Sequence, residues 1–489
     1  MKRLLALIIS SIFALLLVPQ AIGASFKVGA SCKVLGENKS KNNLILECTK
    51  KGKKLAWREV KSSQTKLGFQ FNSVCQVDPD TPEEWKEVEK FLSTGGHCPS
   101  FFKYVPYNVP DTKPTSTITN FNELPAVDTC KVRQPSGQFY PWRGFADPSD
   151  SRMISYYQEF ASPRPKMKIQ MVPITWEEYP SDENPAKVNG KIINFVKEWI
   201  ENSSDNGSDV RVNFPNKYFM MPKPLSQYKD ISIHGQPTPA RAEFWRDVIT
   251  VTDPSIDYQG VTLSIVVVPP VVPLEKFAGN PDGNGLTNEG RIQHMMTISP
   301  LNLTQVHRNA MFFNPHMILH QMSHAGLDIG DYYNAGFWPS VGNGTSDQLS
   351  WDKYLEGFMS DSQIRCASKD QTSTHWLVPS AAKGSYEKLL VVPLSKTKVL
   401  AVESMRAAGY RYKLPRKMEG ALVYTVDTSI TEHGYGTEVI RPSRARIEPS
   451  DGAKQDAALK VGESITFEGV KISVIESGSF GDVIKVEKS

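Results

Sequence analysis

The sequence predicts an α/β (α+β) protein with a twisted sheet, a small N-terminal module and a small C-terminal β unit. Runs with strand composition alternate with runs of helical periodicity between residues 129 and 445. Short strand-like runs separated by glycines fill residues 446–489. The chain has 489 residues and is 40% hydrophobic and 22% charged, which is typical of a globular protein with more than one domain.

The N-terminus predicts a secretory signal peptide over residues 1–24. The basic start MKR precedes the apolar run LLALIISSIFALLLV and the small residues before a cut near Gly23 or Ala24. An uncleaved membrane anchor is the alternative, but the run is short for a full membrane span. No later segment is apolar for long enough to cross a membrane. We therefore expect a secreted or cell-surface protein.

Export would make the six cysteines candidates for disulfides. Buried free thiols are the alternative, and no pair has the Cys-x-x-Cys spacing of a zinc or redox site. Each short loop closed by a disulfide would contribute roughly 3 kcal/mol in the chain-entropy model. The pairs that proximity along the chain favours are Cys32–Cys48, Cys75–Cys98 and, by remainder, Cys130–Cys366.

Residues 25–62 predict a small module with two strands, NLILEC and LAWREV, around the turn KKGKK. The module is too small for a core of its own and would need the Cys32–Cys48 bond. Eleven Lys and Arg stand against three Glu in residues 25–66, a net charge of +8. That charge would attract an anionic cell-surface polymer, or it forms a solvated lysine-rich face. Without interleaved aromatic residues, no nucleic-acid partner is expected.

Residues 63–128 predict a helical segment followed by a linker. The run DPDTPEEWKEVEKFLSTGGHC has a capping residue, a proline in its first turn and a Gly-Gly stop. We expect the Cys75–Cys98 bond to hold this helix. The linker that follows is rich in proline and threonine.

Residues 129–445 predict the main domain. The runs KMKIQMVPITW, DVRVNFPNKYFMMP and GVTLSIVVVPP predict strands, and KVNGKIINFVKEWIEN and PARAEFWRDVITVTDP predict helices. Further strands are predicted for LLVVPLS, KVLAVESM and GALVYTVDT. The run NPDGNGLTNEG, residues 280–290, has the Asp and Asn spacing of a calcium loop, although a surface turn is the favoured interpretation.

A candidate metal site lies in NPHMILHQMSHAGLDIGDYY, residues 314–333. An Asn-Pro pair suits the start of a helix, and His316, His320 and His324 then recur every four residues on one face. Adjacent histidines are ~6 Å apart along the axis and the outer pair ~12 Å. One zinc ion therefore takes an adjacent pair but not all three. A packed helix face without metal is the alternative.

The pair His320 and His324 is the better candidate, because a glycine turn and two acids follow it. Asp331 or Asp328 would supply the third, oxygen ligand. In a working site of this type, a glutamate after the first histidine takes the proton of the attacking water. Gln321 stands there instead, and an amide has no basicity near neutral pH. Loss of a positioned general base typically costs ~10²–10⁴-fold in rate.

The segment ILHQMSHAGLDIGDYY resembles the active-site helix of the immune inhibitor A-like metalloproteases, secreted zinc peptidases whose motif reads His-Glu-x-x-His-x-x-Gly-Leu-x-Asp. The stretches LSWDKYLEGFMSDSQIRC, FWRDVITVTDPSIDYQGVTLSIVVVPP, VVPLSKTKVLAVESMRAAGY and GALVYTVDTSI are similar to other parts of that family. The resemblance covers roughly residues 130–489. It implies a zincin-like fold with an active-site helix, a zinc cofactor, and a protein or peptide substrate.

Carried over residue by residue, the resemblance makes His320 and His324 zinc ligands and places Gln321 at the catalytic glutamate position. Two further departures fall at the same site. Gly326 follows His324 by two positions rather than three, and the expected methionine is not evident in GFWPSVGNGTSDQLSW. The scaffold segments remain recognisable while the departures gather at the site, which indicates a retained scaffold and relaxed chemistry.

The leading hypothesis is a secreted metallopeptidase-family protein with lost or strongly reduced peptidase activity. It would retain zinc and bind peptides, proteins or cell-surface polymers. One alternative is an active secreted zinc endopeptidase with a substitute general base, and another is a structural cell-envelope protein. Weaker candidates for a further ligand, acid or base are His375, His433, Glu356 and Glu403, whose surroundings indicate structural roles.

Overall fold

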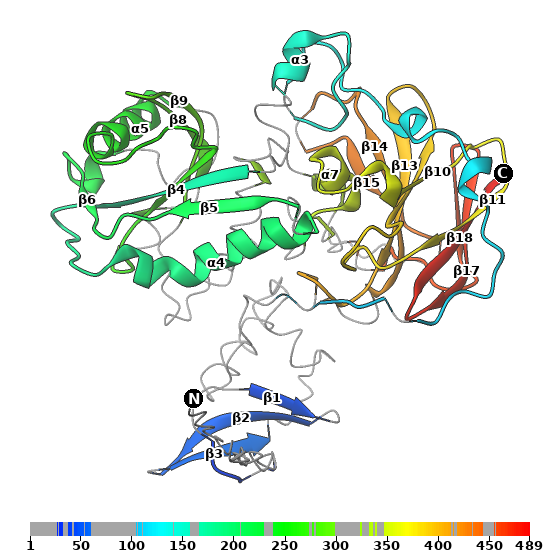
Figure 1. Ribbon diagram of the computed structural model, residues 1–489, viewed down its shortest axis with the longest axis horizontal. Helices are drawn as coiled ribbons and strands as arrows, with labels where there is room; N and C mark the ends of the chain where they lie inside the picture. The colour runs from blue at the N-terminus through cyan, green and yellow to red at the C-terminus, as the bar shows by residue number, and fades with distance from the viewer. Residues whose placement is uncertain are drawn as a thin grey trace, which may run out of the picture.

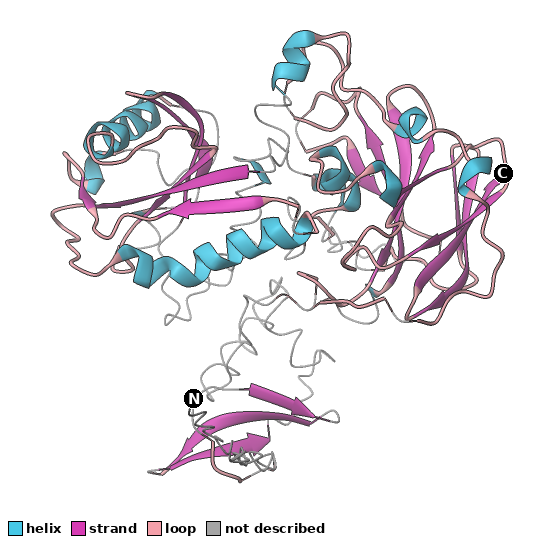
Figure 2. Ribbon diagram, viewed as in Figure 1, coloured by secondary structure: helices cyan, strands magenta, loops and turns pink. Residues whose placement is uncertain are grey.

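The protein consists of a small N-terminal sheet and two larger lobes (Figure 1). The first lobe carries two long helices beside its sheet, and the second lobe is mostly strands (Figure 2). The computed structural model describes residues 27, 29–32, 38–41, 44–52, 54–59, 104, 106–109, 111–139, 141–156, 166–205, 207–228, 238–272, 276–277, 280–298, 323–324, 332–335, 338–339, 347–411, 414, 418–432, 434–443, 454 and 456–489.

A three-stranded antiparallel sheet forms the N-terminal module. Its strands are β1 (Asn38–Lys41), β2 (Leu44–Lys51) and β3 (Lys54–Glu59). β2 and β3 confirm the two predicted strands, whereas β1 has no predicted counterpart. Trp57 is buried against Cys32, which is disulfide-bonded. The predicted helix of residues 63–128 and its Cys75–Cys98 bond lie outside the described residues.

The first lobe is built on a mixed sheet in the order β5-β4-β7-β9-β8, with β6 paired to β4. Its strands are β4 (Lys166–Thr175), β5 (Asp209–Asn213), β6 (Phe219–Met220), β7 (Leu263–Val267), β8 (Asn280–Thr287) and β9 (Gly290–Thr297). All neighbours are parallel except β8, an antiparallel edge strand. Residues 280–287 are thus a strand, so the calcium-loop and surface-turn interpretations were wrong for them, and only residues 288–289 form a turn.

Two helices cover opposite faces of this sheet, as the predicted helical runs require. They are α4 (Pro185–Ser203) and α5 (Pro239–Thr252). Asn184 caps α4 and Thr238 caps α5, and each helix has a proline in its first turn. Because successive strand residues point to opposite faces, Met171 of β4 packs with α4 while Val172 packs with Phe244 of α5.

The second lobe is a sandwich of two sheets. One sheet has the order β10-β12-β13-β14-β15 and the other the order β11-β18-β17-β16. The strands are β10 (Ile364–Cys366), β11 (Ser373–Leu377), β12 (Leu389–Pro393), β13 (Lys398–Met405), β14 (Gly420–Asp427), β15 (Thr437–Val439), β16 (Ser464–Phe467), β17 (Val470–Gly478) and β18 (Gly481–Lys488). The continuous apolar runs predicted as β12, β13 and β14 are buried on both faces, because the second sheet covers one face and the first lobe's core covers the other.

The C-terminal strands share a sheet and a core with the preceding domain. β18 pairs with β11, which precedes it by more than a hundred residues in the chain, and Val474 of β17 packs with Val402 of β13. The linker before residue 129 runs along the same sheet. Glu476 accepts hydrogen bonds from the backbone N–H groups of Thr115 and Ser116, at 2.8 and 2.9 Å. The linker is therefore docked where residues 111–128 are described.

Short helices connect the strands of both lobes, and a disulfide between two described cysteines lies in the second lobe. The helices are η1 (Phe121–Glu123), η2 (Val127–Cys130), α3 (Ser151–Tyr156), η4 (Leu225–Gln227), η7 (Tyr333–Ala335), α7 (Ser350–Leu355) and η8 (Asp361–Gln363). The predicted Cys130–Cys366 disulfide is confirmed and ties η2 to β10. Within the described residues, no helix has the length and apolar character of a membrane span.

Candidate functional site

The histidine segment is described at one of its three histidines. Ser323 and His324 are helical, Ser323 is fully buried and His324 is half-buried. His316, His320, Gln321, Asp328 and Asp331 lie outside the described residues. The site is therefore built here from His324 and from the described residues that contact its neighbours.

The histidine segment contacts the region of helix α7. The amide Nε2 of Gln348, just before α7, donates to the hydroxyl of Ser323 at 3.3 Å. The Tyr332 hydroxyl donates to Oδ1 of Asp352 in α7 at 2.7 Å. Ser323 therefore contacts the residues just before α7 and Tyr332 contacts α7 itself, which lies at the centre of the molecule in Figure 1.

Helix α7 is held in place by a carboxylate from another strand. Glu403 of β13 accepts hydrogen bonds from the backbone N–H of Ser350 at 3.0 Å and from its hydroxyl at 2.8 Å. The first N–H groups of a helix have no partner inside it, so this carboxylate replaces the usual capping side chain. Arg411 lies 3.6 Å from the same carboxylate. Glu403 thus acts as a positioning group for α7.

Two buried carboxyl groups lie one turn apart on α7 and its end. Burial raises the pKa of Asp352 to about 7, and burial together with the nearby Asp352 raises the pKa of Glu356 well above its usual value. Gln348 Nε2 donates to Oε1 of Glu356 at 2.9 Å. Oδ2 of Asp352, Oε2 of Glu356 and Oε1 of Gln348 are buried without a hydrogen-bond partner among the described residues. Such atoms are rare in folded proteins, and each calls for an explanation.

A third acid beside α7 is ionised and paired. Asp347 forms a buried ion pair with Lys353, and Trp199 of α4 donates to its Oδ1 at 2.9 Å. Burial alone would raise the pKa of Asp347, but the charges of Lys353 and Arg411 outweigh it and hold that pKa below its usual value. The pKa values of these neighbouring acids are therefore shifted in opposite directions, that of Asp347 downward and that of Glu356 upward.

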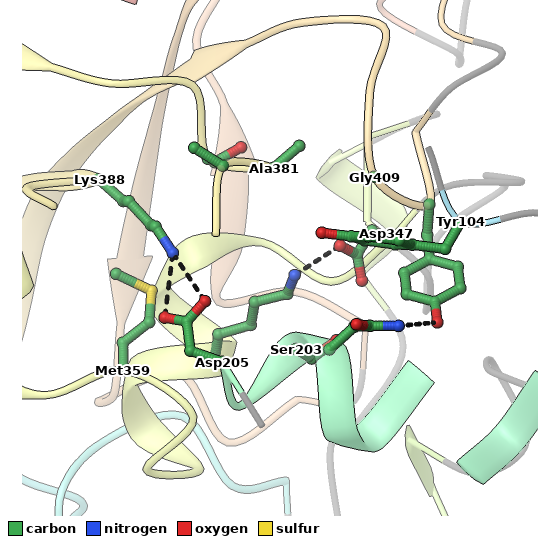
Figure 3. Close-up of a pocket in the computed structure, with 13 residues that line it drawn as sticks. Tyr104, Ser203, Asp205, Asp347, Met359, Ala381, Lys388 and Gly409 are labelled. Atoms are coloured by element: carbon green, nitrogen blue, oxygen red, sulfur yellow. Dashed lines mark hydrogen bonds and ion pairs between the residues drawn. The ribbon is translucent and has the colours of Figure 1, made fainter. Parts of the chain in front are cut away.

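The pocket in Figure 3 is too small for a substrate. It lies where the end of α4, the linker and the loop before β12 meet, and Lys388 pairs there with Asp205 at 3.2 Å. Its free volume is about 20 Å³, which is the space of one water molecule. Burial lowers the pKa of Lys388, although Asp205 opposes this effect. The pocket is therefore a small polar contact region between α4, the linker and the loop before β12.

His375 is a structural histidine. It lies in β11, where Arg365 Nε donates to its Nδ1 at 3.3 Å and Nε2 is 2.8 Å from the Ser373 hydroxyl. Burial and the charge of Arg365 lower its pKa to about 3, so the ring is neutral. His375 therefore serves neither as a distant ligand nor as an acid, whereas His433 lies outside the described residues.

The described residues test the predicted zinc site only in part. They contain no group of three or more His, Cys, Asp or Glu side chains placed to hold a metal ion. His324 supplies one imidazole, and the other predicted ligands lie outside the described residues. The buried acids of α7 adjoin the histidine helix through Gln348 and Ser323. The sequence did not identify Gln348 and Asp352 as residues that contact the histidine segment. The spacing of Asp352 and Glu356 does place both on one helix face.

Comparison of the sequence with known proteins finds no family model and no curated protein that matches this chain. A function for the protein has to follow from the residues and contacts described above.

Proposed function

We propose that this protein is a secreted metallopeptidase-family protein with a zincin-like fold and with lost or strongly reduced peptidase activity. The observation that carries the proposal is the contact between the two resembling segments. Gln348 bonds to Ser323, the neighbour of His324, and Tyr332 bonds to Asp352. The bond from Tyr332 to Asp352 joins the segments ILHQMSHAGLDIGDYY and LSWDKYLEGFMSDSQIRC, and this contact supports assigning both segments to one site.

The arrangement of the first lobe supports the same proposal. In chain order, β9 is the last strand of the mixed sheet. The histidine segment lies between β9 and α7 in the chain. The resemblance implies this order, a twisted sheet followed by an active-site helix. Fold alone does not establish chemistry, so the argument for activity depends on the residues of the site.

His320, His324 and either Asp331 or Asp328 would hold the zinc ion. Zinc at such a site polarises the substrate carbonyl and lowers the pKa of the attacking water. Gln321 stands where the family has its general base, and its amide cannot take a proton. We therefore expect a chain that binds zinc and a peptide or protein but cleaves it slowly.

The active-peptidase alternative requires a carboxylate that replaces the missing base. Glu356 is the nearest described candidate, since Gln348 joins it to Ser323. Burial and the nearby Asp352 raise its pKa well above the usual value, which favours the protonated form, and a protonated carboxyl cannot accept a proton. The electrostatics of α7 thus favour reduced activity over rescue by Glu356.

Zinc content and casein hydrolysis of the purified protein test the proposal together. One zinc per chain, lost on His324→Ala, with little chelator-sensitive hydrolysis of casein, is the expected result. A wild-type chain that degrades casein efficiently would refute the loss of activity. A chain without zinc would refute the metal site.

The basic N-terminal module is proposed to bind an anionic cell-surface polymer. Lys50, Lys51 and Lys54 are exposed at the turn between β2 and β3. Exposed lysines at one turn attract a polyanion without requiring a pocket. Pull-down on cell-wall material with and without residues 25–66 tests this role, and equal retention of both chains would remove it.

A further inference from the structure

A second pocket lies between helix α5 and the hairpin of β8 and β9. Its free volume is about 320 Å³, within the range of small-molecule sites. α5 covers the sheet face opposite α4, whereas Trp199 of α4 contacts Asp347 beside α7. In Figure 1, α5, β8 and β9 gather at the outer end of the first lobe, away from α7. The pocket is therefore separate from the proposed zinc site.

Glycines of β8 shape this pocket. A Cβ on Gly285 would lie 2.6 Å from Cγ1 of Ile249, and one on Gly283 would lie 2.6 Å from the Trp245 ring. Only glycine therefore lets the strand approach α5 so closely. β8 is an edge strand, and its residues Asn284 and Leu286 are exposed at the pocket. The glycine-rich run that suggests a calcium loop in the sequence instead forms one wall of this pocket.

The lining of the pocket is strongly basic. Arg241, Arg246 and Arg291 all line it, and no acid is among its described lining residues. Arg241 is only 2% exposed and lies in the first turn of α5. The acids of α5, Glu243 and Asp247, pair with Lys223. Arg246 and Arg291 are exposed at the pocket, and an anion bound between them would relieve the repulsion between their charges.

The shape of the guanidinium group adds to this preference for an anion. Arginine presents a planar fork of donors that matches phosphate oxygens two at a time. Arg291 is oriented by its hydrogen bond to Oδ1 of Asn284 at 3.1 Å. The basic side of the pocket is thus formed by arginine side chains.

The other side of the pocket is apolar. Trp245 and Ile249 of α5 line it, and Leu286 of β8 is 70% exposed beside them. An exposed leucine next to a buried indole offers a surface for a flat or aliphatic group. We propose that the α5–β8 pocket binds a small phosphate ester, whose phosphate lies between the arginines and whose apolar body covers Trp245 and Leu286.

Calorimetric titration of the intact chain with phenyl phosphate tests the proposal. Binding with a Kd of about 1 mM or tighter is expected, and it should weaken about tenfold or more in Arg246→Gln/Arg291→Gln. Arg211→Gln is the matched control, because Arg211 lies exposed on β5 and pairs only with Asp209 among its described ion-pair partners. Its affinity should equal that of the wild type. No binding of phenyl phosphate, or equal binding by the double variant, would overturn the proposal.

Two further ligands and one further variant test the basic side and the apolar side of the pocket independently. Inorganic phosphate lacks the apolar body, and benzoate lacks the phosphate, so both should bind several-fold more weakly than phenyl phosphate. Leu286→Ala should weaken phenyl phosphate without changing the affinity for inorganic phosphate. Benzoate binding as tightly as phenyl phosphate would overturn the preference for phosphate, and an unaffected Leu286→Ala variant would overturn the apolar contact.

Discussion

At the scale of single residues, burial and neighbouring charges shift the pKa values of the acids around α7. Lys353 and Arg411 hold the pKa of Asp347 below its usual value despite its burial, whereas burial and Asp352 raise the pKa of Glu356 well above its usual value. Asp352 lies between these extremes, with a pKa raised to about 7. A difference of one pKa unit corresponds to about 1.4 kcal/mol between the protonation states. The three acids therefore respond differently to pH although they share one helix and its flanks.

The raised pKa of Asp352 predicts how the stability of the protein depends on pH. Its folded-state pKa of about 7 exceeds the ordinary value of 3.8, so the folded chain holds this proton more tightly. The free energy of unfolding should then fall as pH rises between these two values, by up to about 4 kcal/mol from this residue. Asp352→Asn should flatten that fall and be more stable than wild type at pH 8.

Urea unfolding of both chains at pH 5 and pH 8 measures this effect. Asp257→Asn is the control, because the Asp257 side chain is 72% exposed and its distant pairing with Lys168 contributes little. A wild type and an Asp352→Asn variant with the same dependence on pH would show that the carboxyl is ionised throughout.

At the scale of elements, close approaches between strands decide which glycines are essential. Gly420 begins β14 at a φ of 141°, and a Cβ there would lie 2.3 Å from the Leu459 carbonyl oxygen. Gly290 begins β9 at a similar φ of 131°, but nothing lies within 4 Å of its Cβ position. The two positions share the backbone strain and differ in the available space.

Gly420→Ala should therefore destabilise the protein more than Gly290→Ala. Each variant should lose about 1 kcal/mol or more from the positive φ alone. Gly420→Ala should lose several kcal/mol, because its methyl group must push the Leu459 backbone away from β14. Thermal unfolding of the two variants checks this order. Equal losses of stability would mean that the Leu459 backbone moves away from β14 at little cost in free energy.

Local sequence patterns explain which helices and strands could be predicted from the sequence. The strands β4, β7, β12, β13 and β14 and the helices α4 and α5 follow from apolar runs or helical periodicity, and each forms where it was predicted. β8 was missed because NPDGNGLT has poor strand propensity, and the strand forms only by pairing with β9 beneath α5. The pairing of β11 with β18 joins distant parts of the chain, which a local pattern does not reveal.

The candidate site was predictable in its residue types but not in its surroundings. The sequence nominated His324 from its spacing and Gln321 from its position in the motif. Nothing in the sequence indicated that Gln348 would connect Ser323 to Glu356, because that contact depends on how α7 packs. The burial that changes the charge of Glu356 likewise comes from the tertiary structure.

At the scale of the whole molecule, one disulfide encloses the first lobe. Cys130 and Cys366 lie 236 residues apart in sequence, and the loop between them contains the sheet, the histidine segment and α7. In the chain-entropy model, closing a loop of this length stabilises the folded state by about 5 kcal/mol. This single link therefore constrains both lobes and the site between them.

Replacing both cysteines with alanine should lower the free energy of unfolding by up to about 5 kcal/mol. The loss arises because the unfolded chain regains the freedom of the large loop. Urea unfolding of Cys130→Ala/Cys366→Ala against wild type measures it. A loss below about 1 kcal/mol would show that the disulfide does not restrict the unfolded chain as the chain-entropy model requires.

The central claim is that a metallopeptidase scaffold persists while its general base is absent. Casein hydrolysis by Gln321→Glu, measured beside wild type and Gln321→Ala, tests it most directly. The account predicts that the glutamate variant gains chelator-sensitive hydrolysis of about a hundredfold or more, while the alanine variant remains as inert as wild type. A glutamate variant that binds zinc, folds normally and still cleaves nothing would contradict the claim.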